Sequence, residues 1–120
     1  MLFVAAKGRN AAVSVATDSV EVSSPAGVLE IVQRASVFFL FYIDKRPVLQ
    51  LQPFSGEVRL HQSGQVHLGD DENEHVAVVD GLKVRFFPEP PGSTSAKFWV
   101  EFGEAQVEIE VVEEIEEGGE

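Results

Sequence analysis

The sequence predicts an all-β protein, either an antiparallel β-sandwich or a jelly-roll-like barrel built from hairpins. The chain has 120 residues, the length of one domain, and 44% of them are hydrophobic, which is enough for a packed core. Short runs of alternating polarity follow one another and are separated by tight-turn signals. We therefore expect a single β-sandwich domain over residues 1–112 and an acidic C-terminal tail over residues 113–120.

Residues 76–86 form the clearest predicted hairpin. Asp80-Gly81 is a strong signal for a two-residue type I′ turn, because both central residues of that turn need a positive φ. The turn places Leu82 opposite Val79, and directly opposed residues of an antiparallel pair share one face. One face of this hairpin is then wholly apolar, as a surface that faces a core requires.

Residues 97–110 form a second predicted hairpin, around a Gly103-Glu104 turn with glycine in the first position of a type II′ turn. Trp99, the only tryptophan, falls on the polar face of this hairpin. Aromatic side chains are enriched in the cores of protein interfaces, so Trp99 is a candidate contact residue. The alternative, that the proline-rich loop 88–96 folds over Trp99, stays open.

Two further hairpins are predicted by the same reasoning. One spans residues 2–15 around a Gly8-Arg9 turn. The other spans residues 57–68 around a three-residue loop, 62–64, whose glycine supplies the left-handed position of a β-bulge. Both registers keep apolar residues opposite apolar residues.

The stretch SVFFLFYI, residues 36–43, contains seven consecutive apolar residues, whereas a strand with one wet face should alternate. We expect a four-residue loop, 44–47, to pair this stretch with residues 48–52. This register places the following side chains on the core: Phe38, Leu40, Tyr42, Leu49 and Leu51.

Phe39, Phe41 and Ile43 then need cover on the other face of the strand. Each large apolar side chain left in water forgoes roughly 1.5–3 kcal/mol, and three together would form a patch that marks an interaction site. A second subunit would provide this cover, so Phe39, Phe41, Ile43 and Trp99 are the predicted interface. A short helix near residues 25–35 would provide it within the chain.

The segment SSPAGVLEIVQRAS fits either that helix or a strand. Val28, Ile31 and Val32 recur at helical spacing, and Ser24 before Pro25 suits the start of a helix. The run VLEIVQ also fits a strand that follows a Pro-Ala-Gly turn. The sequence leaves both interpretations open.

Charge is distributed unevenly along the chain, whose net charge is −11. Residues 1–69 hold six basic and five acidic residues, whereas residues 70–120 hold three basic and fifteen acidic residues. Direct binding to nucleic acid is not expected, because it requires clustered Lys and Arg. An acidic surface for a protein partner is predicted from these residues: Asp70, Asp71, Glu72, Glu74, Glu113, Glu114, Glu116 and Glu117.

We expect neither catalysis nor a bound cofactor or metal. The chain has no cysteine, which excludes disulfides and thiolate chemistry. His61 and His67 share a face in the predicted register, but the neighbouring Arg59 would repel a cation. The loop GDDENEH, residues 69–75, has the oxygen density that calcium needs without the spacing of an EF-hand loop, so a solubilising loop is favoured. The sequence also has no nucleophile elbow and no glycine-rich phosphate loop.

The leading hypothesis is a non-enzymatic structural protein that forms homo-oligomers or decorates a larger assembly, such as a virion or other shell. One alternative is an acidic inhibitor or chaperone that binds a basic protein surface by mimicking nucleic acid. Another is a ligand- or carbohydrate-binding module in which Trp99 stacks on the ligand and Asp70 and Asp71 bind calcium. The sequence shows no export signal and no membrane segment, so a cytoplasmic or virion location is expected.

Overall fold

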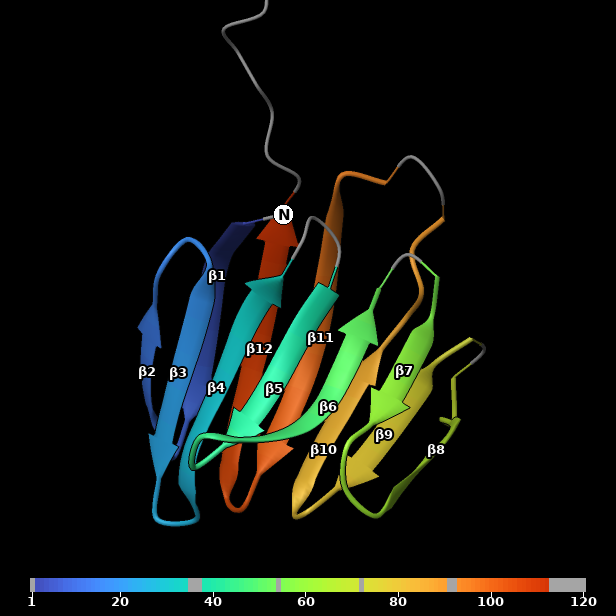
Figure 1. Ribbon diagram of the computed structural model, residues 1–120. Helices are drawn as coiled ribbons and strands as arrows, with labels where there is room; N and C mark the ends of the chain where they lie inside the picture. The colour runs from blue at the N-terminus through green and yellow to red at the C-terminus, as the bar shows by residue number, and fades with distance from the viewer. Residues whose placement is uncertain (1, 35–37, 54, 72, 91–92, 113–120) are drawn as a thin grey trace, which may run out of the picture.

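The protein is a sandwich of two antiparallel β-sheets that pack face to face (Figure 1). The computed structural model describes residues 2–34, 38–53, 55–71, 73–90 and 93–112, which contain twelve strands and no helix. The described chain accordingly has no helix long and apolar enough to cross a membrane. The predicted β-sandwich is confirmed.

Each sheet has six strands. Sheet A has the order β1-β12-β11-β10-β9-β8, and sheet B has the order β2-β3-β4-β5-β6-β7. The strands of sheet A are β1 (Leu2–Arg9), β12 (Ala105–Val112), β11 (Ser95–Phe102), β10 (Leu82–Phe86), β9 (His75–Val79) and β8 (Gly64–Leu68). The strands of sheet B are β2 (Ala12–Val15), β3 (Ser19–Ser24), β4 (Gly27–Arg34), β5 (Phe38–Ile43), β6 (Arg46–Gln52) and β7 (Glu57–Leu60).

The chain follows a meander, in which consecutive strands are neighbours, rather than the Greek-key path of a jelly roll. It crosses between the sheets after β1 and again after β7, and β12 completes the path by pairing with β1. On one side of the sandwich β2 packs against β1. On the other side sheet A ends at β8 and sheet B ends at β7, so the two sheets do not close into a barrel.

Aromatic rings connect the two sheets in the core. Phe39 of β5 is fully buried, and its ring centroid lies 5.4 Å from that of Phe3 and 5.2 Å from that of Phe98, edge-to-face in both cases. Such pairs contribute about 0.5–1.5 kcal/mol beyond the area they bury. Because Phe39 belongs to sheet B and its two partners belong to sheet A, this stack holds the sheets together.

Two of the predicted hairpins are confirmed in register. β9 and β10 pair with Leu82 opposite Val79, and Asp80 and Gly81 between them both have positive φ. β11 and β12 pair in the predicted register around Gly103. In both cases the turn residues can adopt conformations that most residues avoid, which fixes the loop length and therefore the register.

The hairpins predicted at residues 2–15 and 57–68 are wrong. β1 pairs with β12 and β2 with β3, whereas β7 pairs with β6 and β8 with β9. The chain changes sheets at Asn10, which has a φ of 60°, and at residues 61–63. Apolar alternation cannot distinguish these arrangements, because the apolar faces of both sheets point to one core.

Of the two interpretations left open for residues 25–35, the strand holds over the described residues of that segment and the short helix is wrong. A two-residue turn, Pro25-Ala26, joins β3 to β4. Leu29 and Ile31 of β4 are fully buried, at the spacing of two that a strand requires.

The two faces of β5 are the reverse of the prediction. Asp44 and Lys45 form a two-residue turn with φ of 48° and 68°, in place of the expected four-residue loop. The pairing of β5 with β6 then shifts at a bulge, because Val48 is an extra residue between the partners of Phe41 and Tyr42. The core side chains of β5 are therefore Phe39, Phe41 and Ile43, whereas Phe38, Leu40 and Tyr42 lie half-buried on the outer face of sheet B.

Candidate functional site

Three of the four residues predicted as an interface lie inside the sandwich. Phe39 and Phe41 are fully buried and Ile43 is 6% exposed, so none of them can contact another molecule while the fold is intact. Sheet A of the same chain supplies the cover that was expected from a second subunit or from a short helix near residues 25–35. That part of the interface prediction is wrong.

An exposed apolar surface exists instead at strand β8, the edge of sheet A, at the right in Figure 1. All five residues of β8 are exposed. Val66 and Leu68 point toward the interior side of the sheet, yet they are 43% and 70% exposed. β7 is the strand of sheet B that contacts β8, and it leaves both side chains accessible. Leu68 has the largest exposed fraction among the large hydrophobic residues that the structure describes.

The outward backbone groups of β8 can be assigned from the ladder that it forms with β9. The N–H of Gly69 donates to the carbonyl of Glu74 at 2.8 Å, in the same register as the strand pairs. Bonded and non-bonded pairs alternate along an antiparallel ladder, so Gln65 and His67 also bond to β9. The N–H and C=O groups of alternate residues, Gly64, Val66 and Leu68, therefore point away from the sheet. The Leu68 carbonyl lies 3.0 Å from Nδ1 of His67.

The other sheet edges are protected in ways that β8 is not. β7 carries Glu57 and Arg59, and β1 carries Lys7 and Arg9, and charged side chains on an edge strand discourage pairing with another chain. β2 has no charged residue, but it packs against β1 of the same chain. β8, with the sequence GQVHL, contains no Asp, Glu, Lys or Arg.

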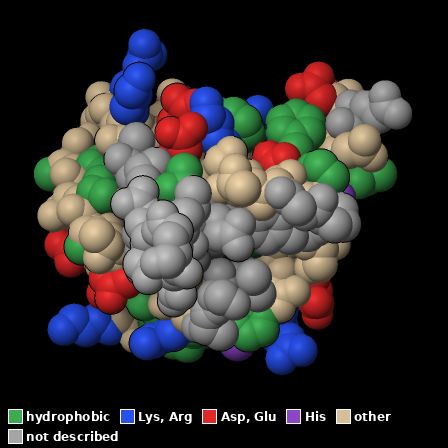
Figure 2. Space-filling model, turned by 90° about the horizontal axis from the view of Figure 1, so that it is seen from above, with side chains coloured by type: hydrophobic (Ala, Val, Ile, Leu, Met, Phe, Trp, Pro, Cys, Tyr) green, Lys and Arg blue, Asp and Glu red, His purple; other side chains and the backbone are tan. Residues whose placement is uncertain are grey.

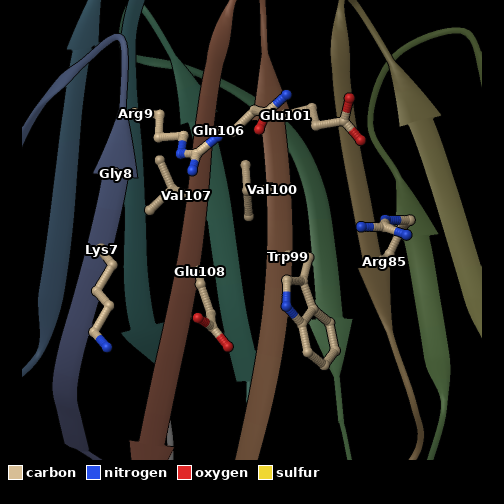
Figure 3. Close-up of a pocket in the computed structure, with 10 residues that line it drawn as sticks. All are labelled: Lys7, Gly8, Arg9, Arg85, Trp99, Val100, Glu101, Gln106, Val107 and Glu108. Atoms are coloured by element: carbon tan, nitrogen blue, oxygen red, sulfur yellow. The ribbon is translucent and has the colours of Figure 1, made fainter.

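A second candidate site is a hollow of 470 Å³ on the outer face of sheet A, around Trp99. Trp99 lies between Glu108 of β12 and Arg85 of β10, its direct partners in the ladder (Figure 3). Seen from outside the sheet, the indole ring is close to face-on. Phe87 packs against it edge-to-face, with ring centroids 6.0 Å apart, which supports the ring without covering all of it.

Charged side chains of both signs surround Trp99. Arg85 forms an ion pair with Glu74 at 3.6 Å, and Lys97 forms one with Glu108 at 3.6 Å. Lys7 and Arg9, on the β1 side of the hollow, have no ion-pair partner among the described residues. The Nε atom of Arg85 is buried and has no hydrogen-bond partner in the described structure.

The predicted acidic surface is only partly assembled. Asp70 and Asp71 are exposed, but Glu74 is buried, 6% exposed, beside Arg85, so its predicted role in partner binding is wrong. Glu72 and the four predicted residues of the tail, Glu113, Glu114, Glu116 and Glu117, lie outside the described residues. In the end-on view, both acidic and basic side chains are scattered around the rim of the molecule (Figure 2).

The histidines and the acidic loop do not converge. His61 lies in the crossing from β7 to β8, whereas His67 lies on the outer face of β8. Within the described ranges, no group of three or more His, Asp or Glu side chains is arranged to hold a metal ion.

Sequence reasoning placed Trp99 correctly on the polar face but missed both the open edge and the hollow. The hollow could have been predicted from the sequence. The two confirmed hairpins place Trp99 beside Glu108 and on the same face as Arg85. The edge was hidden by the false pairing of residues 57–68. The absence of charged residues from the run GQVHL is the feature of the sequence that indicates the open edge.

Comparison with known proteins adds no functional information: no family model matches the chain, and neither the curated proteins nor the solved structures include a match.

Proposed function

We propose that this chain is a non-enzymatic structural protein that self-associates by joining sheet A of two copies along β8. The observation that carries the proposal is the exposure of Val66 and Leu68 on an edge strand without charged side chains. An edge of this kind is a template for pairing with another strand. It supplies the apolar surface for assembly that Phe39, Phe41 and Ile43 cannot supply.

The sequence of β8 is complementary to itself in an antiparallel arrangement. A two-fold axis at Val66 sets Val66 opposite Val66 of the second copy, and Gly64 opposite Leu68. The outward backbone groups of these residues can form an antiparallel ladder, in which the Leu68 carbonyl, already 3.0 Å from Nδ1 of His67, uses its second lone pair. Leu68, the most exposed large hydrophobic side chain among the described residues, meets a glycine that offers it space, and no like charges oppose each other within the strand.

The dissociation constant of the dimer can be estimated from the few apolar side chains that the contact buries. Full burial of a wholly exposed Val or Leu is worth roughly 1.5–3 kcal/mol. Both copies contribute one of each, and each gains only part of this amount because Val66 and Leu68 are 43% and 70% exposed. The loss of translational and rotational freedom opposes this gain. We therefore expect a reversible dimer with a dissociation constant on the order of 10–100 μM.

The substitution Val66→Lys should weaken this dimer by about 100-fold, because it places two like charges directly opposite each other on the axis. Sedimentation equilibrium from about 1 μM to 1 mM protein measures the change. Val28→Lys is the matched control, since Val28 is 38% exposed on the outer face of sheet B, and it should change the constant less than about threefold. Equal effects of the two substitutions would contradict the proposal, as would a wild-type chain that stays monomeric throughout.

The substitution Val66→Pro tests the backbone contribution. Proline removes the outward N–H of residue 66 but no bond to β9, so it is tolerated on this edge. We expect the folded monomer to persist, with its circular dichroism spectrum unchanged, while the dimer is lost. A dimer of undiminished strength would show that the contact lies elsewhere.

In about 1 M salt the wild-type dimer should persist, whereas association through the acidic residues would collapse.

A further inference from the structure

We infer that the hollow around Trp99 binds a saccharide that carries a carboxylate, such as a uronate. The hollow lies on the outer face of sheet A, across β1, β12, β11 and β10. Its volume of 470 Å³ is within the roughly 300–1,000 Å³ of small-molecule sites. It adds a ligand site that the self-association of β8 neither requires nor explains.

The indole of Trp99 provides a flat apolar platform. It is seen close to face-on from outside the sheet (Figure 3), and the ring of Phe87 lies perpendicular to it, with the ring centroids 6.0 Å apart. The face of an aromatic ring carries partial negative charge. The C–H groups on one face of a pyranose ring carry partial positive charge and stack on such a surface. The Nε1 group of Trp99 has no hydrogen-bond partner among the described residues, so it can donate to a ligand hydroxyl.

Polar groups surround the platform in the plane where sugar hydroxyls project. Two adjacent rows of the ladder cross the hollow, one with Lys7, Glu108, Trp99 and Arg85, the other with Arg9, Gln106 and Glu101. Carboxylates accept hydrogen bonds, guanidinium and ammonium groups donate them, and an amide does both. A polyhydroxylated ring, whose hydroxyls donate and accept, matches this mixture better than an apolar ligand does.

The unpaired cations select for an acidic sugar. Lys7 and Arg9 line the β1 side of the hollow with no carboxylate partner in the described structure, although the chain as a whole carries a net charge of −11. A single carboxylate on the ligand would form charge-assisted hydrogen bonds with them. A nucleotide would also stack on Trp99. Its phosphate, however, has more negative charge than a single carboxylate, so Glu101 and Glu108 would repel it more strongly. The geometry therefore favours a saccharide over a nucleotide.

Trp99 is the only tryptophan, so its fluorescence reports on this site alone. We expect oligogalacturonate to shift or quench the emission, with a dissociation constant on the order of 0.1–1 mM. A neutral cello-oligosaccharide should bind at least about fivefold more weakly, and adenosine monophosphate should produce no saturable change. No change with any oligosaccharide, or tighter binding of the nucleotide, would overturn the inference.

Substitutions distinguish the contribution of Trp99 to binding from the contribution of Lys7 and Arg9. Lys7→Gln combined with Arg9→Gln should weaken uronate binding at least about fivefold and leave binding of the neutral sugar within about twofold. Lys83→Gln is the matched control, because Lys83 is exposed on the same face but does not line the hollow, and it should change neither constant. Trp99→Phe should weaken the binding of both oligosaccharides, measured by calorimetry because this variant has no tryptophan fluorescence. The inference fails if Lys83→Gln has the same effect as the double substitution, or if Trp99→Phe changes nothing.

Discussion

Phe39→Ala is expected to destabilise the fold by about 4 kcal/mol. Phe39 is fully buried, and its ring contacts Phe3 and Phe98 of the opposite sheet. Removing the ring deletes both aromatic contacts and leaves a cavity between two sheets that can collapse only in part. For a chain of this length, with a total stability of roughly 6–18 kcal/mol, this is a large fraction. Urea denaturation measures the loss as a lower transition midpoint.

Phe38→Ala is the control, because Phe38 is the adjacent residue and lies half-buried on the outer face of sheet B. We expect it to cost only about 1 kcal/mol. If Phe39→Ala proves too unstable to purify, the milder pair Phe39→Leu and Phe38→Leu should show the same order. A larger loss for the Phe38 variants would mean that the faces of β5 are those expected from the sequence and not those of the structure.

The inverted faces of β5 show how much a strand register depends on the turn. The sequence run 36–43 is apolar on both faces, so composition cannot say which face is inside. The turn determines which face points inward. Asp44-Lys45 is a weak type I′ signal, because Lys45 adopts a φ of 68° and is neither Gly nor Asn. Asp80-Gly81 is a strong signal, and the hairpin around it was predicted in the correct register.

The candidate edge could not be predicted for a different reason. Hydrophobic alternation shows which face of a strand points to the core, but not which neighbour the strand pairs with. Leu60 and Val66 both point inward, so a hairpin between them is as consistent with the pattern as a crossing between sheets. Only the crossing leaves β8 at an edge. The position of Trp99, in contrast, depends on a single well-defined turn and was predicted.

Gly27→Ala is expected to destabilise the fold by about 3 kcal/mol, although the substitution adds one methyl group to a partly exposed position. Gly27 has a φ of 134°, a conformation that residues with a side chain rarely adopt. A Cβ atom there would lie 2.9 Å and 3.0 Å from the two carboxylate oxygens of Asp44. That carboxylate is held in place, because Oδ1 of Asp44 accepts a hydrogen bond from the N–H of Val28 at 3.0 Å and the N–H of Asp44 donates to the Val28 carbonyl at 2.9 Å.

Gly81→Ala is the matched control for Gly27→Ala. Gly81 also has a positive φ, 79°, but a Cβ atom there would have no neighbour within 4 Å, so we expect a cost of only about 1 kcal/mol from backbone strain. The double variant Gly27→Ala with Asp44→Ala should lose at least about 0.5 kcal/mol less than the sum of the two single losses, because removal of the carboxylate also removes the clash. Thermal and urea unfolding of all four variants measure these differences. Strict additivity of Gly27→Ala and Asp44→Ala would mean that the Asp44 carboxylate does not press on a side chain at position 27, so that backbone strain alone accounts for the loss in Gly27→Ala.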